Sequence, residues 1–301
     1  MTGPVPTTGA IPPLGVVLPQ VEGGFDELAE VAAGVERAGA GAVWLTDHLY
    51  WHGPAVDVVG ALPIVAQATS HCLVGPCVLQ LPLRATAATA KSMAYLDHLA
   101  PGRVVVGVGV GEHRAEYDAA GLGPIFEHRG MLLDAGIADL RAAWSGGLSS
   151  SGPFGSDADG RFTMAPARPL PVWVGGRSER ARRRAAALGD GWIPHLCRLD
   201  WYAAQMPLLH ADLAAAGRAE VPFVRGALLA VSVDGVEPDI DPLAWLGNLY
   251  GLDPQAFARV LVRGTADEVG ATLTRFRQAG ADHLALMVAG HDPTAHLAAL
   301  S

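Results

Sequence analysis

The sequence predicts an α/β protein built as a (β/α)₈ TIM barrel. Short runs rich in Val, Ile and Leu alternate with longer, Ala-rich segments of helical period along almost the whole chain, and eight such apolar runs can be counted. Parallel strands that are buried on both faces have this continuous apolar pattern. An eightfold alternation within 301 residues favours a closed barrel. An open, doubly wound sheet is the alternative.

The expected elements fill one domain, residues 1–301. The predicted strands are Leu14–Leu18, Ala42–Thr46, Leu73–Leu79, Arg103–Val108, Val172–Val174, Gly191–Ile193, Phe223–Val231 and His283–Val288. The predicted helices cover residues 24–38, 56–69, 84–98, 128–144, 177–187, 199–216 and 266–279.

Two segments interrupt the alternation, and both are expected to be insertions over the C-terminal face of the barrel. Residues 145–171 are rich in Gly, Ser and Pro, which is typical of a long loop. Such a loop is either a lid or a surface excursion, and the sequence does not choose between them. Residues 235–258 contain Pro238, Pro242 and Pro254 between two short amphipathic stretches, which predicts a small helical insertion.

Composition excludes several classes of protein. A net charge of −9 argues against a nucleic-acid partner, because such proteins usually present a basic face. Three cysteines without C-x-x-C spacing argue against a disulfide framework or a structural zinc site. Neither a signal-peptide pattern nor an apolar run long enough to span a bilayer is seen. We therefore expect a cytoplasmic location and no membrane association.

The first polar cluster follows the second predicted strand, where active-site residues of barrels lie. Asp47, His48, Trp51 and His52 fall within six residues there. Histidine titrates near neutral pH and can exchange protons with a substrate. The structural alternative is that Asp47 caps the loop and His48 is a buried, hydrogen-bonded histidine.

A second cluster follows the fourth predicted strand. Gly107, Gly109 and Gly111 alternate there, and glycine lets a flat ring or a phosphate approach the backbone closely. The G-x-G-x-G spacing differs from the dinucleotide fingerprint. Glu112 ends the run as an acid, a base or a solvated charge.

A third cluster follows the fifth predicted strand and leads directly into a predicted helix. Val174, Gly175, Gly176 and Arg177 are its members. Free N–H groups at a helix N-terminus bind phosphate, and an arginine adds a charge-assisted contact. These residues therefore predict a phosphate-binding site. Metal binding is not expected, because no pair of histidines has metal-ligand spacing, and no nucleophile motif such as G-x-S-x-G is present.

Six motifs, in this order, resemble the bacterial luciferase-like superfamily along nearly the whole chain. They are LGVVLPQ, GAVWLTDHL, LPLRATAATAKSMAYLDHLAPGRVVVGVGVG, EHRGMLLDAGIADLRAAWSGG, PVWVGGRSERARRRAAALGDGWIPH and VRGTADEVGATLTRFRQAGADHLALMV. The resemblance implies a luciferase-like (β/α)₈ barrel that holds a flavin or deazaflavin at the C-terminal ends of its strands.

The resemblance also assigns roles to residues. Val174, Gly175, Gly176 and Arg177 would gather the cofactor phosphate, and Gly107 and Gly109 would flank the ring or the ribityl chain. Leu79 and Gln80 would pass behind the tricyclic ring, where many relatives carry a non-prolyl cis peptide bond. Asp47, His48, Trp51 and Glu112 match, with Trp51 offset by one residue, positions in sugar-phosphate dehydrogenases that use coenzyme F420. Those enzymes hold their sugar phosphate with lysines, whereas this chain has only Lys91.

The resulting hypothesis is an F420-dependent oxidoreductase that transfers a hydride between the deazaflavin C5 and a small organic substrate. His48 would be the general acid or base, Glu112 its partner or a second proton carrier, Trp51 a stacking wall, and Asp47 part of the cofactor site. The alternatives are an FMN-dependent monooxygenase that uses reduced flavin and O₂, and a non-catalytic flavin-binding protein. Relatives of this kind imply a homodimer.

Overall fold

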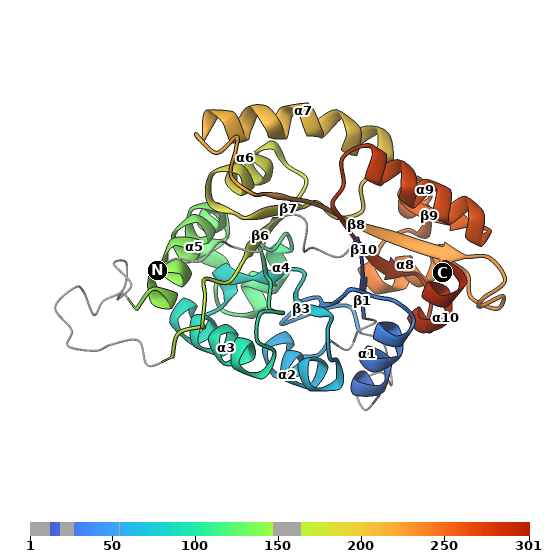
Figure 1. The fold of residues 1–301 in the computed structure, drawn as a ribbon, viewed down its shortest axis with the longest axis horizontal. Coiled ribbons are helices and arrows are strands. Elements are labelled where there is room, and N and C mark those ends of the chain that lie inside the picture. The colour runs from blue at the N-terminus through green and yellow to red at the C-terminus, as the bar shows by residue number, and fades with distance from the viewer. Residues whose placement is uncertain (1–12, 19–26, 54, 147–163) are drawn as a thin grey trace.

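A ring of parallel strands surrounded by helices forms the core of the protein in the computed structural model, which describes residues 13–18, 27–53, 55–146 and 164–301 (Figure 1). The strands are β1 (Leu14–Val17), β2 (Ala42–Leu45), β3 (Leu73–Pro76), β4 (Leu79–Gln80), β5 (Val106–Gly109), β6 (Val172–Gly175), β7 (Gly191–Ile193), β8 (Val224–Val233), β9 (Leu261–Gly264) and β10 (His283–Val288).

Helices follow most of these strands, and most of them lie around the outside of the ring (Figure 1). They are α1 (Leu28–Arg37), α2 (Val58–Ala68), α3 (Thr86–Leu99), α4 (Arg114–Ala119), α5 (Arg129–Trp144), α6 (Glu179–Leu188), α7 (Leu199–Ala215), α8 (Pro242–Tyr250), α9 (Ala266–Gln278) and α10 (Pro293–Ala299). Among the described residues, no helix has the length and hydropathy needed to cross a membrane.

The strand order confirms the predicted barrel. Hydrogen-bonded neighbours run β3-β2-β1-β10-β8-β7-β6-β5-β4, and every pairing is parallel. The two ends of this path are joined by the chain itself, because β3 continues into β4, and Val74 of β3 bridges to Val104 just before β5. The strands therefore form a nearly closed ring, with all their C-terminal ends at one face.

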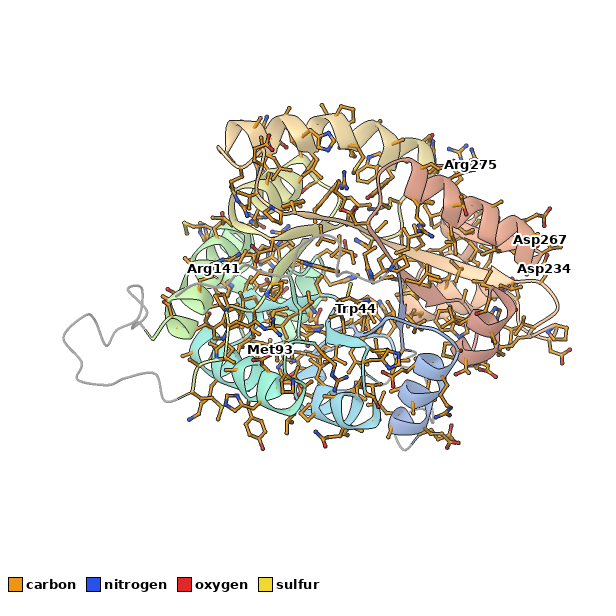
Figure 2. All side chains as sticks on the ribbon, viewed as in Figure 1. Trp44, Met93, Arg141, Asp234, Asp267 and Arg275 are labelled. Atoms are coloured by element: carbon orange, nitrogen blue, oxygen red, sulfur yellow. The ribbon has the colours of Figure 1, made fainter. Side chains whose placement is uncertain are left out.

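Side chains alternate between two apolar layers along each strand, as the pleat requires. Val16 and Val43 belong to the layer between strands and helices, whereas Val17 and Trp44 belong to the layer inside the ring. Trp44 is 1% exposed and lies near the middle of the ribbon, while Asp234 and Asp267 lie at its periphery (Figure 2). A filled interior leaves open space for a ligand only at the ends of the barrel.

Several boundaries differ from the predicted ones. The expected strand Leu73–Leu79 is split into β3 and β4 by a cis peptide bond between Cys77 and Val78, which lies just before the expected Leu79–Gln80 stretch. The strand β9 was not predicted, and it pairs with the end of β8, Ala230–Val233. The short helices α4 and α10 were also not predicted, because a helix of six or seven residues carries little periodicity.

Of the two insertions expected from the sequence, the structure describes one completely and the other only in part. The helical insertion expected at 235–258 is confirmed, because α8 and a 3₁₀ helix at Pro254–Phe257 lie there. Helix α8 starts at Asp241, whose carboxylate accepts a hydrogen bond from the Leu243 N–H, and ends at Gly251 with a left-handed φ of 61°. Of the expected loop 145–171, residues 147–163 lie outside the described part of the chain.

Candidate active site

A cavity opens at the C-terminal ends of the strands and encloses about 810 Å³ of empty space, solvent at its mouth included. This volume is in the range of small-molecule and cofactor sites. Its lining residues come from the strands β4, β5, β6, β7, β8 and β10, from the segments that follow β2, β3, β5, β6 and β7, and from α8. They are Thr46, Asp47, His48, Trp51, Cys77, Val78, Gln80, Gly109, Val110, Gly111, Glu112, Gly175, Gly176, Ile193, His195, Leu228, Tyr250 and Met287.

His48 is held by a carboxylate that the sequence did not single out. Its Nδ1 lies 3.4 Å from Oε2 of Glu116, and the side chain of Glu116 is 1% exposed. When Nδ1 carries a proton, it donates to this carboxylate, and Nε2 is the nitrogen left to exchange a proton with a bound molecule. The carboxylate beside His48 is thus Glu116, in the first turn of α4 and four residues after Glu112.

Glu116 also organises the loop on which His48 lies. Its Oε1 accepts hydrogen bonds from the Leu49 N–H (2.6 Å) and from the Gln80 amide nitrogen (2.9 Å). Burial alone would raise the pKa of Glu116, but the hydrogen bonds from His48, Gln80 and Leu49 outweigh it and hold this pKa below the ordinary range. The site therefore contains a buried, ionised carboxylate behind the histidine.

Hydrogen bonds between Asp47 and Gln80 connect the loop after β2 to strand β4. The Gln80 N–H donates to Asp47 Oδ2 (2.9 Å), and the Gln80 amide nitrogen donates to the Asp47 carbonyl (2.7 Å). The guanidinium of Arg84 pairs with both carboxylate oxygens of Asp47. Asp47 is 2% exposed, so this bidentate pair neutralises a buried charge.

An aromatic cluster covers one side of the cavity. The rings of His48 and Trp51 stack at 3.7 Å between centroids. Trp51 also contacts the rings of His52, His113 and Tyr250 at 5.2, 4.9 and 5.8 Å. Trp51 thus lies at the centre of the cluster, beside the residue expected to transfer protons.

Val78 forms the apolar floor of the cavity, and glycines on two neighbouring strands leave room for its side chain. A Cβ at Gly109 would lie 2.6 Å from Val78 Cγ2, and a Cβ at Gly175 would lie 2.9 Å from Val78 Cγ1. Only glycine leaves room for Val78 at these positions. Gly109 and Gly175 line the cavity, whereas Gly107 lies behind it, where a Cβ would meet the Pro76 carbonyl oxygen at 2.3 Å.

Not every expected cofactor residue reaches this cavity. Leu79 and Val174 are fully buried in the layer between strands and helices, and neither lines the cavity. Of the expected Leu79–Gln80 stretch, Gln80 lines the cavity, and Cys77 and Val78 take the place in the wall that was expected for Leu79. The alternation of side chains explains this placement, because Val78 and Gln80 point to one face of the strand and Leu79 to the other.

The expected phosphate site lies at the start of α6. Gly176 lines the cavity with φ 106°, a conformation open to glycine, and Ser178 caps α6 through a hydrogen bond from the Ala181 N–H. Arg177 is exposed, and its Nη1 donates to the Leu196 carbonyl (3.1 Å) in an adjoining groove. Gly175 and Gly176 therefore border the cavity directly, and Arg177 lies next to it.

Three further lining residues were not singled out from the sequence: His195, Tyr250 and Met287. The Tyr250 hydroxyl lies 3.7 Å from the Met287 sulfur, and burial raises the pKa of Tyr250. His195 follows β7 directly, and its position after a predicted strand was the signal available in the sequence. Tyr250 had no such signal, because it comes from the helical insertion.

Glu112 lines the cavity but lies apart from His48. Its side chain is 62% exposed, and its Oε1 lies 3.8 Å from His113 Nε2 and 3.9 Å from His195 Nε2. Among the described residues, one group of side chains is close enough to hold a metal ion: Glu36, His71 and Cys72, between α1 and β3. That group lies at the other end of the strands, away from the cavity.

Comparison with known proteins places these features in context. The sequence model of the family described as luciferase-like monooxygenase matches residues 13–241. An F420-dependent glucose-6-phosphate dehydrogenase of Kineococcus radiotolerans is 27% identical, over 91% of this chain and 90% of its own. An F420-dependent hydroxymycolic acid dehydrogenase of Mycobacterium tuberculosis is 34% identical over 64% of this chain, and this alignment spans about half of that relative's length (55%).

Solved structures show the same fold. An F420-dependent secondary alcohol dehydrogenase, in complex with an F420-acetone adduct, superposes with a TM-score of 0.82 at 20% identity, covering 95% of this chain and 96% of its own. The oxygenating constituent of 3,6-diketocamphane monooxygenase from Pseudomonas putida, in complex with FMN, gives a TM-score of 0.74 at 15% identity, with 95% and 96% covered.

Proposed function

Because the chain belongs to the luciferase-like monooxygenase family, we propose that it is an F420-dependent oxidoreductase which transfers a hydride between the deazaflavin C5 and a small organic substrate. The observation that carries this proposal is that His48, held by the buried carboxylate of Glu116, lines the same cavity as the apolar floor at Val78.

The residues present suit a flat, phosphate-bearing cofactor. Val78, with no side chain on Gly109 or Gly175 beside it, offers a floor against which a tricyclic ring can pack. Gly176 and the N-terminus of the ten-residue helix α6 border the same cavity, and such a terminus favours phosphate. Arg177 is a cation next to that terminus. These groups would hold the two ends of the cofactor.

The cofactor supplies the hydride chemistry when it is bound, and the protein supplies orientation and proton transfer. His48 holds a proton at Nδ1 against Glu116 and can give or take one at Nε2. Trp51 stacks on His48 and fixes the plane of its ring. The apolar floor and the aromatic cluster exclude water from the region between them.

The names of the curated relatives favour F420 over FMN. The FMN-containing monooxygenase shares the fold at 15% identity, which is no guide to the cofactor. A protein that only sequesters the cofactor would not need a histidine in the cavity backed by a buried carboxylate, because burying an ionised group is costly.

The test is a titration of the purified apoprotein with oxidised F420 and, separately, with FMN, followed by quenching of tryptophan fluorescence. We expect F420 to bind at least about tenfold more tightly than FMN. The opposite preference, together with oxygen consumption when reduced FMN is supplied, would instead identify an oxygen-dependent monooxygenase. Binding of neither compound would refute the phosphate role of Gly175, Gly176 and Arg177.

We also propose a cytoplasmic homodimer. The exposed apolar side chains Ile64 of α2, Tyr95 of α3 and Met131 of α5 support a protein interface on this side of the barrel. Light scattering coupled to size-exclusion chromatography measures the mass in solution, and a monomer mass at micromolar concentration would contradict the dimer.

A further inference from the structure

The strand order places a second histidine directly across the barrel from His48. His48 follows β2 and His195 follows β7. Four steps separate these strands in either direction around the ring, through β1, β10 and β8 or through the joined β3 and β4, β5 and β6. Both side chains line the same cavity. They therefore reach it from opposite walls.

The backbone holds His195 in a defined position. His195 forms a β-bridge with Leu228, and the next residue, Leu196, donates its N–H to the Leu228 carbonyl (2.8 Å). Leu196 has φ 46°, in the left-handed region that is unfavourable for leucine. The Arg177 guanidinium fixes the same turn by donating to the Leu196 carbonyl. A side chain positioned in this way is suited to contact a ligand.

Within the described part of the chain, the surroundings of the His195 imidazole leave it open to that contact. The side chain is 29% exposed, and the nearest carboxylate oxygen, on Glu112, is 3.9 Å from Nε2, beyond hydrogen-bond distance. Burial lowers the pKa of His195, Glu112 after β5 opposes this effect, and Arg177 after β6 adds to it. The imidazole is then neutral at neutral pH, with one nitrogen that donates and one that accepts.

We propose that His195 is a substrate-binding residue, which contacts the reacting oxygen of an uncharged alcohol or carbonyl compound from the wall opposite His48. This inference rests on the proposed function, because it assigns the part of the cavity beyond the cofactor floor to the substrate. It adds a residue, His195, to which the family resemblance assigns no role.

The chemistry requires two partners for that oxygen. When a secondary alcohol is oxidised, its C–H bond breaks and the hydride, with both electrons, goes to the oxidised deazaflavin. The O–H bond also breaks, the C=O double bond forms, and the hydroxyl proton passes to an imidazole. One histidine can accept this proton while the other donates a hydrogen bond to the same oxygen.

The remaining lining residues indicate that the substrate carries no negative charge. Leu228, Met287 and Tyr250 form the wall beside His195. Neither lysine nor arginine is found among the described residues that line the cavity, and Glu112 is acidic. A phosphorylated substrate would lie there without a cation to neutralise it, which is strongly unfavourable in a partly buried site. An apolar body that carries one oxygen function suits these walls.

The experiment uses the protein loaded with reduced F420, so that an added alcohol cannot be oxidised. Cyclohexanol is the probe, and the ring signals of His48 and His195 are followed by ¹H–¹³C NMR, each assigned by its loss in the His48→Gln and His195→Gln variants. We expect cyclohexanol to shift both signals, and glucose 6-phosphate at the same concentration to shift neither.

Variants test the contact itself. His195→Leu removes both hydrogen-bonding nitrogens and should weaken cyclohexanol binding about three- to tenfold, while leaving F420 affinity unchanged. His195→Gln keeps a donor and an acceptor and should restore part of the affinity, which a purely structural role would not predict. His210→Gln, on the exposed face of α7, is the matched control and should bind cyclohexanol normally.

Each result of these experiments either supports or contradicts the proposed role of His195. A shift of the His48 signal alone, a shift of neither signal, or equal cyclohexanol affinity in His195→Leu would overturn the proposal. If F420 itself fails to bind, the proposed function fails, and the response of the His195 signal to cyclohexanol in the apoprotein still decides whether this wall binds alcohols.

Discussion

Glu116 Oε2 lies 3.4 Å from His48 Nδ1, and the same carboxylate accepts hydrogen bonds from the Leu49 N–H and the Gln80 amide nitrogen. One buried carboxylate therefore fixes both the ring and the backbone of the loop after β2. The proton-transfer residue and the fold of its loop depend on the same group, so that substitutions at Glu116 should affect activity and stability together.

Glu116→Gln should reduce both properties. The new amide has an N–H₂ group where Glu116 has its second carboxylate oxygen. This group cannot accept a hydrogen bond from Gln80, Leu49 or His48, so at least one hydrogen bond is lost. We expect turnover to fall roughly tenfold and the free energy of unfolding to fall by about 1–3 kcal/mol. Urea unfolding and steady-state kinetics measure the two effects. Glu127→Gln, at an exposed position, is the control, and a Glu116→Gln protein as stable and as active as that control would contradict this reading.

His48→Ala should separate chemistry from cofactor binding. General acid–base catalysis contributes roughly 10²–10⁴ in rate, so turnover should fall by this order. F420 affinity should stay nearly the same, because Val78, Gly175 and Gly176 are untouched. Steady-state kinetics beside a fluorescence titration gives both values. Unchanged turnover would remove His48 from the mechanism.

The pair of Arg84 and Asp47 offers a double-mutant cycle. Arg84→Met leaves the buried carboxylate of Asp47 without its cation and should destabilise the protein by about 3–5 kcal/mol. Adding Asp47→Asn removes the charge and should recover a large part of this loss. The free energies of unfolding of the four proteins measure the coupling. Strict additivity would show that the two side chains act independently.

Gly109→Ala should weaken cofactor binding more than it weakens the fold. The new methyl group would lie 2.6 Å from Val78 Cγ2 and push that side chain from its place in the floor. We expect F420 affinity to fall at least about tenfold, which is about 1.4 kcal/mol. Gly270→Ala, in α9 with nothing within 4 Å of the added Cβ, is the matched control and should bind F420 normally. Equal affinity in both variants would refute the role of Val78.

Glu36 should make stability depend on pH in the acid range. Burial would raise its pKa, but hydrogen bonds from the N–H groups of His71, Cys72 and Ser70 lower it from 4.5 to about 2. A carboxylate whose pKa is lower in the folded protein stabilises the fold at any pH above its pKa in the unfolded chain. This stabilisation is lost as the pH falls from about 4.5 to about 2.

Glu36→Gln should therefore lower the free energy of unfolding by roughly 1–2 kcal/mol at pH 7, a value reduced for solvent screening, and by almost nothing near pH 2. Urea unfolding at several pH values measures the difference, with Glu30→Gln on the exposed face of α1 as the control. A constant difference at every pH would show that the charge of Glu36 does not contribute.

The barrel could be predicted from the sequence because its signal is repeated. Buried strands such as β2 and β6 consist of apolar residues without interruption, and each observed strand except β9 overlaps a predicted run. The strand β9 was missed since its sequence, LVRG, includes an arginine and is only partly buried. It pairs with the far end of the long strand β8, a tertiary relation that local pattern does not contain.

The candidate site was predicted less completely, for physical reasons. His48 and Gly175 follow strands directly, so the barrel rule alone places them at the cavity. Glu116 lies inside a helix and reaches His48 across 68 positions of sequence. Glu112 precedes it by four residues and was the more visible acid, but its exposed side chain points elsewhere. Which of the two glutamates contacts His48 depends on the direction of their side chains, and a single sequence does not show this direction.

Helix α8 contributes one residue, Tyr250, to the described lining of the cavity, whereas His48, Val78, Gly109 and Gly175 are carried by the barrel strands and the loops that leave them. The two parts are separate in the chain and meet at the rim, where Gly251 approaches His52. The segment between β8 and β9 therefore shapes the rim of the cavity, whereas the barrel carries His48 and the floor at Val78. Substitutions in this segment would then alter the entrance for a substrate without changing the position of either residue.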